Sequence, residues 1–348
     1  MFGQAGNNPG EEFIGFQGFH KNRISGVFFM KKVFLVILSV SMVLVFSACQ
    51  NPAADSEDNS DVPIGTVGYV SERLTDTFNA GFKPSNESSA IARNAVLISR
   101  EETTQVLQAA AVRDLIEEDV SVIVVYPAND SKDDPGWEAV LAEAKAAGIG
   151  VIFIVSAPDE ALDYTTLLVS NDYENGKLDA DWLKEHVTGP QTILEISGPV
   201  DHPAAIARHA GFIANKPADW DMVEPVYGGW DPENSKTVTA AWLAANPGTP
   251  VDIVFAHNDG IALGAIEALQ EAELTVGTGA GEIRVVSVDA VEAALISVAA
   301  GELACTVYQG MPALGPVLFD AIQDYVNGTV LEKTMYTNSV CIDAGNLP

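Results

Sequence analysis

Short apolar runs alternate with longer amphipathic stretches along most of the chain. The runs are nearly continuous in valine and isoleucine, and they end in glycine, asparagine, aspartate or proline. Parallel strands that are buried on both faces have this pattern, because neither face needs polar side chains. The clear strands are predicted at residues 66–70, 120–126, 150–155, 192–196, 251–256 and 283–288.

Helical stretches lie between these strands. Trp137, Val140, Leu141 and Ala144 fall on one helical stripe, and Gly148 follows as the expected C-terminal cap. Residues 261–272 predict a second helix with an apolar face. Alternation of strand and helix over this length predicts an α/β fold with open parallel sheets. Ligands of such sheets bind beyond the carboxyl ends of the strands.

The amino-terminal region predicts export and a lipid anchor. Lys31 and Lys32 precede an apolar run at residues 33–46, and Phe46-Ser47-Ala48-Cys49 resembles a lipobox. Positive charge, a short apolar core and small residues form the order of a signal peptide. Because a membrane span needs roughly 20 apolar residues, a lipoprotein is favoured over an uncleaved anchor. Residues 30–48 are then the signal peptide, and Cys49 carries the lipid.

Two segments beside the signal have no core-forming pattern. Residues 1–29 are rich in glycine, asparagine and phenylalanine, and the simplest hypothesis is a start at Met30, with residues 1–29 untranslated or disordered. Residues 49–62 are rich in small and polar side chains and predict a flexible tether. The folded part begins near Pro63, and its roughly 285 residues suffice for two compact domains.

The charge of the chain excludes one class of partner. The chain holds 18 basic and 48 acidic residues, and its first 48 residues contain four of the basic and two of the acidic ones. The part that follows has 14 basic and 46 acidic residues, a net charge of −32. Such a surface repels a phosphate backbone, so nucleic-acid binding is not expected. The acidic excess favours solubility and identifies no ligand.

Cys305 and Cys341 both lie in apolar, strand-like runs. Outside the cytoplasm they could pair, or they could stay as two separate buried thiols, and the sequence leaves both readings open. The chain has no Cys-x-x-Cys motif and no histidine cluster. No metal site and no other cofactor is therefore predicted.

Polar and aromatic side chains gather where the predicted strands end. They are Trp230, His257, Asn258, Asp259, Asp289 and Gln309. Asparagine or aspartate at a strand–helix junction also caps helices, so capping and ligand contact both stay open for Asn258 and Asp259. Carboxylates and amides bond hydroxyl groups, while an aromatic face covers the C–H face of a sugar ring. The cluster as a whole favours a sugar ligand.

Several segments resemble a known family. Residues 255–266, Phe-Ala-His-Asn-Asp-Gly-Ile-Ala-Leu-Gly-Ala-Ile, are similar to the strand–helix signature of ribose- and galactose-type periplasmic binding proteins, which capture sugars for ABC importers. Segments within residues 136–145, 174–178 and 205–212 resemble the galactofuranose-binding branch. The similarity covers nearly all of residues 64–345. It implies a monomeric binding protein, not an enzyme, that delivers a monosaccharide to an ABC permease and its ATPase.

The resemblance also implies a type I periplasmic binding protein fold. This fold has two doubly wound parallel-sheet α/β lobes joined by a three-strand hinge, which closes over the sugar in the cleft between the lobes. The first lobe is expected at residues 63–156 plus 310–335, and the second at 157–309 plus 336–348. The crossings between lobes are expected near residues 156–158, 309–311 and 335–337.

The implied sugar contacts come from both lobes. Arg208 stands where relatives place a guanidinium over the sugar hydroxyls, and Trp230 stands where an aromatic ring stacks. A buried Arg208 needs an acidic partner, and Asp289 is the expected one. The expected ligand-binding residues are Ser71, Phe78, Tyr126, Arg208, Trp230, Asn258, Asp289 and Gln309.

Val155-Ser156 departs from the family pattern, which usually has Asp-Arg here in contact with the sugar. Losing two charge-assisted hydrogen bonds corresponds to roughly two to four decades of affinity. Either the ligand is less polar on that side, or another segment compensates. The candidate is the loop at residues 128–134, which contains Asn129, Asp130, Lys132, Asp133 and Asp134. The departure removes the pattern that would name the sugar.

Three other functions are possible for a chain of this kind. An enzyme would need a nucleophile elbow, a phosphate loop or a metal-ligand cluster, which the sequence lacks, and packing is favoured over a general-base role for His257. A sugar-responsive transcription regulator would need a basic headpiece before residue 63. A ligand-sensing lipoprotein that presents a sugar or other solute to a membrane sensor or chemoreceptor stays open, as does the choice of membrane that holds the anchor.

Overall fold

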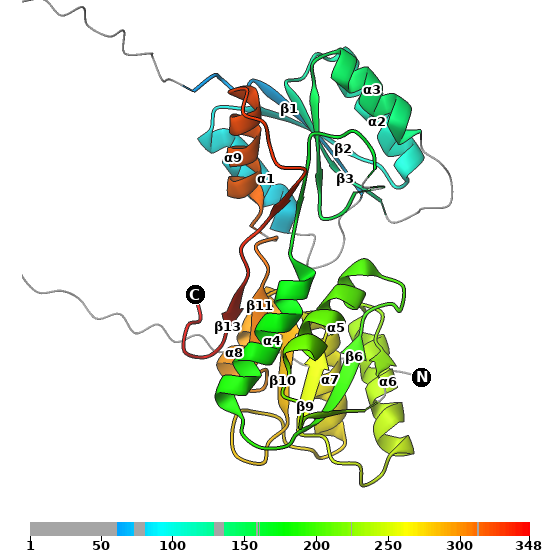
Figure 1. Cartoon of the computed structure of the whole chain (residues 1–348), viewed down its shortest axis with the longest axis vertical. Helices are drawn as coiled ribbons and strands as arrows, with labels where there is room; N and C mark the ends of the chain where they lie inside the picture. Colours follow the sequence, from blue (N-terminus) through cyan, green and yellow to red (C-terminus); the bar gives the residue numbers. More distant parts are fainter. Residues whose placement is uncertain are drawn as a thin grey trace, which may run out of the picture. The chain divides into compact units, whose positions relative to one another are not determined.

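The computed structural model describes residues 61–72, 81–128, 136–157, 159, 161–223, 225–311 and 313–348 (Figure 1). Residues 1–29, the predicted signal peptide, Cys49 and almost all of the tether lie outside the described residues, as do Phe78 and most of the loop at 128–134. Within the described part of the chain, no helix is long and apolar enough to cross a membrane.

The first lobe is built on a parallel sheet with the strand order β12-β5-β4-β3-β1-β2. Its strands are β1 (Thr66–Ser71), β2 (Val96–Glu101), β3 (Val122–Tyr126), β4 (Gly150–Ile154), β5 (Thr166–Val169) and β12 (Thr334–Tyr336). Helices α1 (Phe82–Ala92) and α9 (Gly315–Val326) cover one face, and α2 (Gln105–Glu117) and α3 (Trp137–Ala146) cover the other (Figure 1).

The second lobe has the strand order β13-β11-β10-β9-β6-β7, and β8 also pairs with β6. Its strands are β6 (Thr192–Ser197), β7 (Asp221–Met222), β8 (Val226–Tyr227), β9 (Ile253–Ala256), β10 (Arg284–Val288), β11 (Cys305–Tyr308) and β13 (Val340–Ile342). Its helices are α4 (Asp172–His186) and α5 (Pro203–Asn215) on one face, and α6 (Pro232–Ala245), α7 (Asp259–Glu271) and α8 (Glu292–Ala300) on the other. Only β13 is antiparallel to its neighbour in this described sheet.

The alternation of side chains along β3 explains why this strand is apolar throughout. Val122 and Val124 belong to the core beneath α1 and α9, whereas Ile123 and Val125 belong to the core beneath α2 and α3. All four side chains are fully buried. The prediction of strands buried on both faces, and with it the predicted α/β fold with two parallel sheets, is confirmed.

The chain leaves the first sheet later than expected. Strand β5 pairs with both β4 and β12, so the first lobe continues through Val169 and the first crossing lies at residues 170–171. The expectation of a crossing near residues 156–158 is therefore wrong. A strand of four residues offers too few positions for its periodicity to reveal it. Because β12 runs to Tyr336, the last crossing lies at residues 337–339.

Cys305 on β11 and Cys341 on β13 form a disulfide, with their Cα atoms 6.4 Å apart. The bond decides between the two readings of these cysteines in favour of pairing. It closes a loop between residues 36 positions apart, and this loop contains the second and third crossings. In the chain-entropy account, closing a loop of this length stabilises the folded state by about 4 kcal/mol.

Glycines set the spacing between paired helices of the second lobe. A Cβ atom on Gly176 of α4 would overlap the carbonyl oxygen of Arg208 on α5, and one on Gly211 of α5 would overlap that of Tyr173. A Cβ atom on Gly264 of α7 would likewise overlap the carbonyl oxygen of Pro232 on α6. Each helix pair therefore packs at a distance that only glycine allows.

We expect Gly264→Ala to lower the free energy of unfolding by about 1–3 kcal/mol, because the added methyl group forces α6 and α7 apart. Thermal unfolding of the purified protein measures this. Gly260→Ala in the same helix is the matched control, because the nearest atom to its added Cβ is at 3.5 Å. The control should change stability by less than about 1 kcal/mol. Equal unfolding temperatures for the two variants would contradict the packing argument.

Candidate functional site

Two buried polar side chains meet at the carboxyl end of the second sheet. Asp289 follows β10 and Gln309 follows β11, and these strands pair in register up to Val288 and Val307. Nε2 of Gln309 donates to Oδ1 of Asp289 at 2.5 Å. The two residues are 5% and 3% exposed. The structure therefore brings together two residues that the sequence predicted for the site.

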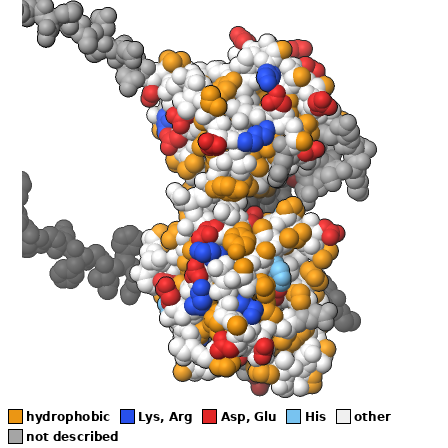
Figure 2. Space-filling view, viewed as in Figure 1, with side chains coloured by type: hydrophobic (Ala, Val, Ile, Leu, Met, Phe, Trp, Pro, Cys, Tyr) orange, Lys and Arg blue, Asp and Glu red, His pale blue; other side chains and the backbone are white. Residues whose placement is uncertain are grey.

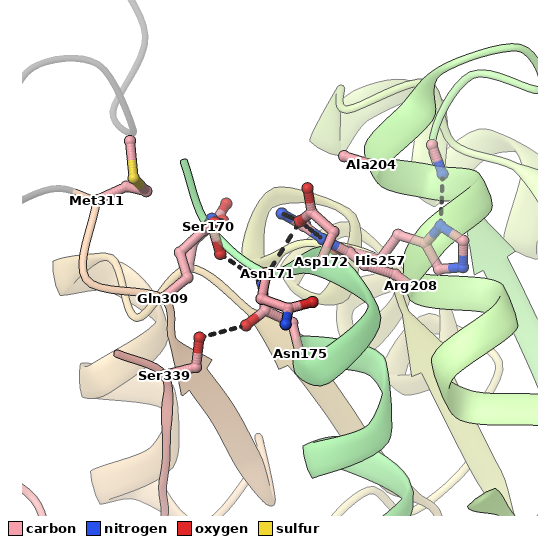
Figure 3. Close-up of polar contacts among 12 residues, drawn as sticks. Ser170, Asn171, Asp172, Asn175, Ala204, Arg208, His257, Gln309, Met311 and Ser339 are labelled. Carbon is pink, nitrogen blue, oxygen red and sulfur yellow. Dashed lines mark hydrogen bonds and ion pairs between the residues drawn. The ribbon is translucent and has the colours of Figure 1, made fainter. Parts of the chain in front are cut away.

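Arg208 lies on α5 and is also buried (Figure 3). Its Nε atom donates to Oδ1 of Asp172 at 2.9 Å, and Nη2 forms an ion pair with the same oxygen at 2.8 Å. Nη1 donates to the carbonyl oxygen of His257. The direct acidic partner of Arg208 is thus Asp172, and the expectation that it would be Asp289 is corrected. Burial alone would lower the pKa of Arg208, but Asp172 and Asp289 raise it, so the guanidinium stays charged.

Trp230 lies beside this guanidinium, whose central carbon is 5.6 Å from the ring centroid. The residue precedes α6 and has a φ of +66°, a left-handed conformation that is unusual for a bulky side chain. Gly198 packs against the indole ring, where a Cβ atom would overlap it. The ring of His202 meets that of Trp230 edge-on, with centroids 5.2 Å apart. Two of the residues predicted for the site, an aromatic side chain and a cation, therefore lie together.

Asn258 begins α7, and its side-chain oxygen accepts a hydrogen bond from the backbone nitrogen of Ile261 at 2.9 Å. This is the capping role that the sequence left open. Asp259 is fully buried and accepts from Ser287, Thr306 and the backbone nitrogen of Val291 at 2.5, 2.6 and 2.8 Å. Its oxygens are engaged within the lobe, so Asp259 has a structural role.

In the first lobe, Ser71 and Tyr126 are paired in register at the carboxyl ends of β1 and β3. Ser71 is 2% exposed, and Tyr126 is half-buried with its ring 5.7 Å from that of Phe82. The parallel sheet therefore brings these two predicted residues to one edge. The third predicted residue of this lobe, Phe78, lies outside the described residues.

Val155 follows β4 at the same end of the first sheet, and its φ is +68°. A β-branched residue rarely adopts this conformation, which costs on the order of 1–3 kcal/mol. Its side chain packs against the core beneath α1 and α9. The position that departs from the family pattern is therefore apolar and conformationally strained.

A buried chain of polar groups lies beneath the second-lobe edge. Nε2 of His257 is 2.7 Å from Oε1 of Glu195, and its Nδ1 is 3.2 Å from the hydroxyl oxygen of Ser197. Burial lowers the pKa of His257. Burial alone would raise the pKa of Glu195, but the contact with His257 lowers it. Because Gly198 also donates its backbone N–H to Nδ1, the proton of a neutral His257 lies on Nε2, facing Glu195.

The sequence did not single out Asp172, Asn175 or His202 as site residues. Asp172 and Asn175 lie in the first two turns of α4, and His202 caps α5 by accepting from the backbone nitrogen of Ala204 at 3.2 Å. The only signal for Asp172 is its place directly after the cap residue Asn171, a common position for acidic residues at a helix start. Its contact with Arg208 depends on how α4 packs on α5, which no local pattern encodes.

Acidic side chains on the face drawn in Figure 2 are scattered among basic and apolar ones on both lobes. Across the residues that the structure describes, no group of three or more histidine, cysteine, aspartate or glutamate side chains is placed to hold a metal ion. What the described site offers is a cation, an aromatic face, carboxylates and amides. These groups can bind a polyhydroxylated solute through hydrogen bonds and ring contact.

The buried Asp289 should make stability depend on pH. Burial raises its pKa from 3.8 to about 8, so between pH 5 and 8 the folded protein holds a proton that the unfolded chain has released. The free energy of unfolding therefore falls as pH rises through this window. In the unmodified protein, this proton should make the unfolding temperature fall by a few degrees between pH 5 and 8. We expect Asp289→Asn to remove this part of the pH dependence.

Asp163→Asn is the control for this measurement. Asp163 is exposed, and Lys145 lowers its pKa, so this carboxylate is ionised in both folded and unfolded states above pH 5. The control should keep the slope of the unmodified protein. Parallel slopes for the unmodified protein and Asp289→Asn would show that Asp289 does not hold the proton.

Residues 67–329 match the family model described as a periplasmic binding protein domain. The chain is 32% identical to the galactofuranose-binding protein YtfQ of Escherichia coli over 284 residues, which cover 79% of this chain and 86% of YtfQ. These matches span both lobes.

Two solved structures extend the comparison. The arabinose ABC transporter binding protein of Shewanella sp. ANA-3, bound to L-arabinofuranose, is 32% identical with a TM-score of 0.65, and the match covers 79% of this chain and 91% of that one. A protein of Mycobacterium smegmatis in complex with β-D-fucofuranose is 28% identical with a TM-score of 0.67, covering 80% and 91%. The chain therefore belongs to the periplasmic binding protein domain family, in the type I fold shared by sugar-binding proteins of ABC transporters.

Proposed function

We propose that this protein captures a monosaccharide in its furanose form between its two lobes and delivers it to the permease and ATPase of an ABC importer. The observation that carries the proposal is the group of Arg208, Trp230, Asp289 and Gln309 at one end of the second sheet. Relatives whose names specify galactofuranose, arabinofuranose and fucofuranose favour a five-membered sugar ring.

The four side chains suit complementary parts of a sugar. The Trp230 ring offers a surface for the apolar C–H face. Arg208 donates two hydrogen bonds among the described residues and has five N–H donors, so it can also donate to ligand hydroxyls. The bond between Asp289 and Gln309 can be exchanged for bonds to hydroxyls, which both donate and accept. Asn258, beside them at the end of β9, extends the same polar edge.

The first lobe offers a less polar surface. Ser71 and Tyr126 supply hydroxyl groups, whereas the apolar Val155, which packs against the core, stands where the family pattern usually has a charged residue. We infer that the ligand has fewer hydroxyls on this side, or that the loop at residues 128–134 supplies the missing polar groups. Phe78 is proposed to stack on the sugar from this lobe.

Family membership implies export from the cytoplasm. The disulfide between Cys305 and Cys341 supports this, because such bonds persist in oxidising compartments. We propose that the signal peptide at residues 30–48 is removed and that lipid on Cys49 anchors a monomer to the membrane. The segment from residue 50 to residue 62 then acts as the tether.

The buried Ser197, His257 and Glu195 do not favour an enzyme, although a serine, an imidazole and a carboxylate in contact are also the components of hydrolase sites. Their exposures are 7%, 0% and 2%, so a substrate would have little access to the hydroxyl group or the imidazole. His209 gives Glu195 a second partner at 2.8 Å. These contacts are those of a polar cluster that satisfies a buried carboxylate.

Thermal unfolding against galactose, ribose, arabinose, xylose and methyl galactofuranoside tests the proposed function. A sugar at about 1,000 times its Kd should stabilise the protein by roughly 4 kcal/mol, which raises the unfolding temperature by on the order of 10 °C. A shift with the locked furanoside or with a sugar that populates furanose forms supports the proposal. The absence of any shift across the panel would contradict it.

Arg208→Ala should weaken binding of the panel sugar at least about tenfold, because a hydrogen-bonding cation is lost from a buried site. Isothermal titration calorimetry measures the change. Arg113→Ala is the matched control, since Arg113 forms an exposed ion pair with Glu143 in the first lobe and should leave affinity unchanged. Unaltered affinity in a folded Arg208→Ala protein would refute the role of Arg208.

A further inference from the structure

Asn175 connects two of the three segments that pass between the lobes. It lies in the second turn of α4 and is fully buried. Its Nδ2 atom donates to the hydroxyl oxygen of Ser170 at 2.8 Å, in the first crossing. Its Oδ1 atom accepts from the hydroxyl of Ser339 at 2.6 Å, in the third crossing. Figure 3 shows the Asn175 amide between these two serines.

The same amide contacts the partner of Arg208. Nδ2 of Asn175 is 3.4 Å from Oδ1 of Asp172, the atom that accepts the hydrogen bond from Nε of Arg208 and pairs with its Nη2. Arg208, Asp172 and Asn175 therefore form a continuous polar chain from the candidate sugar site to two crossings. Asp172 and Asn175 are three residues apart on α4, so their side chains are neighbours on one face of the helix.

Thr337 also bonds the third crossing to the end of β5 and to the second crossing. The backbone nitrogen of Thr337 donates to the carbonyl oxygen of Val169 at 3.0 Å, and its hydroxyl donates to that of Gln309 at 2.6 Å. Gln309 is itself the partner of Asp289. The candidate ligand groups and the three crossings thus share one hydrogen-bonded network.

We propose that Asn175 is a positioning residue that couples sugar contact at Arg208 to the first and third crossings, and so to closure of the lobes. The proposal rests on the proposed function, in which Arg208 contacts the sugar. The Asn175 amide donates to the first crossing and accepts from the third. Both hydrogen bonds form only when the two crossings keep one arrangement. A sugar that shifts Arg208 and Asp172 biases that arrangement, which is the physical requirement for coupling.

A double-mutant cycle between Ser339 and Arg208 tests the coupling. Ser339→Ala removes one hydrogen bond from Asn175 and changes neither Asn175 nor Arg208. We expect it to weaken binding of the panel sugar with the largest thermal shift by about three- to tenfold. In the Arg208→Ala background, the same substitution should change affinity less than about twofold. An equal loss of affinity in both backgrounds would overturn the coupling.

Ser235→Ala is the matched control. Ser235 is a fully buried serine whose hydroxyl donates to the carbonyl oxygen of Ile261 at 2.7 Å, between α6 and α7. Both serine substitutions should lower the unfolding temperature by a similar amount, but only Ser339→Ala should lower affinity. If the two variants lose stability alike and neither loses affinity, Ser339 has a structural role alone and the proposal fails.

A second readout needs no sugar. The Nε–H group of Arg208 donates to Asp172, and nitrogen–proton NMR reports this hydrogen bond directly. We expect its resonance to shift in Ser339→Ala and to stay in place in Ser235→Ala. If no panel sugar binds, the proposed function fails, yet a shifted resonance still supports the coupling. An unshifted resonance overturns it whether or not a sugar binds.

Discussion

The burial of one guanidinium group organises the ligand edge of the second lobe. Arg208 is 5% exposed, and a charge taken out of water must be compensated by a nearby anion. Asp172 supplies that anion because α4 packs tightly on α5, an approach that Gly176 makes possible at the carbonyl group of Arg208 itself. The close approach of α4 to α5 at Gly176 therefore also brings Asp172 to Arg208. In this way the packing of the two helices fixes the orientation of the guanidinium group.

Four aspartates lie in or near this end of the second lobe, and the structure accommodates each carboxyl group differently. Asp172 pairs with Arg208, Asp259 accepts three hydrogen bonds, and Asp289 accepts from Gln309. Asp179 is fully buried, its oxygens have no hydrogen-bond partner among the described residues, and burial raises its pKa. The carboxyl groups of this lobe are therefore accommodated by ion pairing, by hydrogen bonds or by a raised pKa, and not by one common mechanism.

The central strands could be predicted from the sequence because both of their faces are buried and their apolar runs are continuous. The stripe of Trp137, Val140, Leu141 and Ala144 was equally clear, and all four side chains are buried in α3. Edge strand β2 was missed because its side chains are half-exposed and mixed in character, and β5 was missed because it is short. The family resemblance predicted Arg208 and Trp230 as site residues, but it did not predict the pairing of Arg208 with Asp172, because that pairing depends on the contact between two helices.

Among the described residues, backbone strain that helix ends do not explain is found at the candidate site. Three of the non-glycine residues with positive φ, Asn94, Asp119 and Glu273, directly follow helices, where a left-handed residue commonly ends the last turn. The other four, Val155, Trp230, Asp289 and Ala290, lie in the turns at the ligand ends of the sheets, where helix termination does not explain them. Strain of this kind persists only when surrounding contacts enforce it, and it concentrates where side chains must be aimed at a ligand. In the second lobe the strained positions carry an indole ring and a carboxyl group, and in the first lobe the strained position carries a valine side chain, which agrees with the site that we propose.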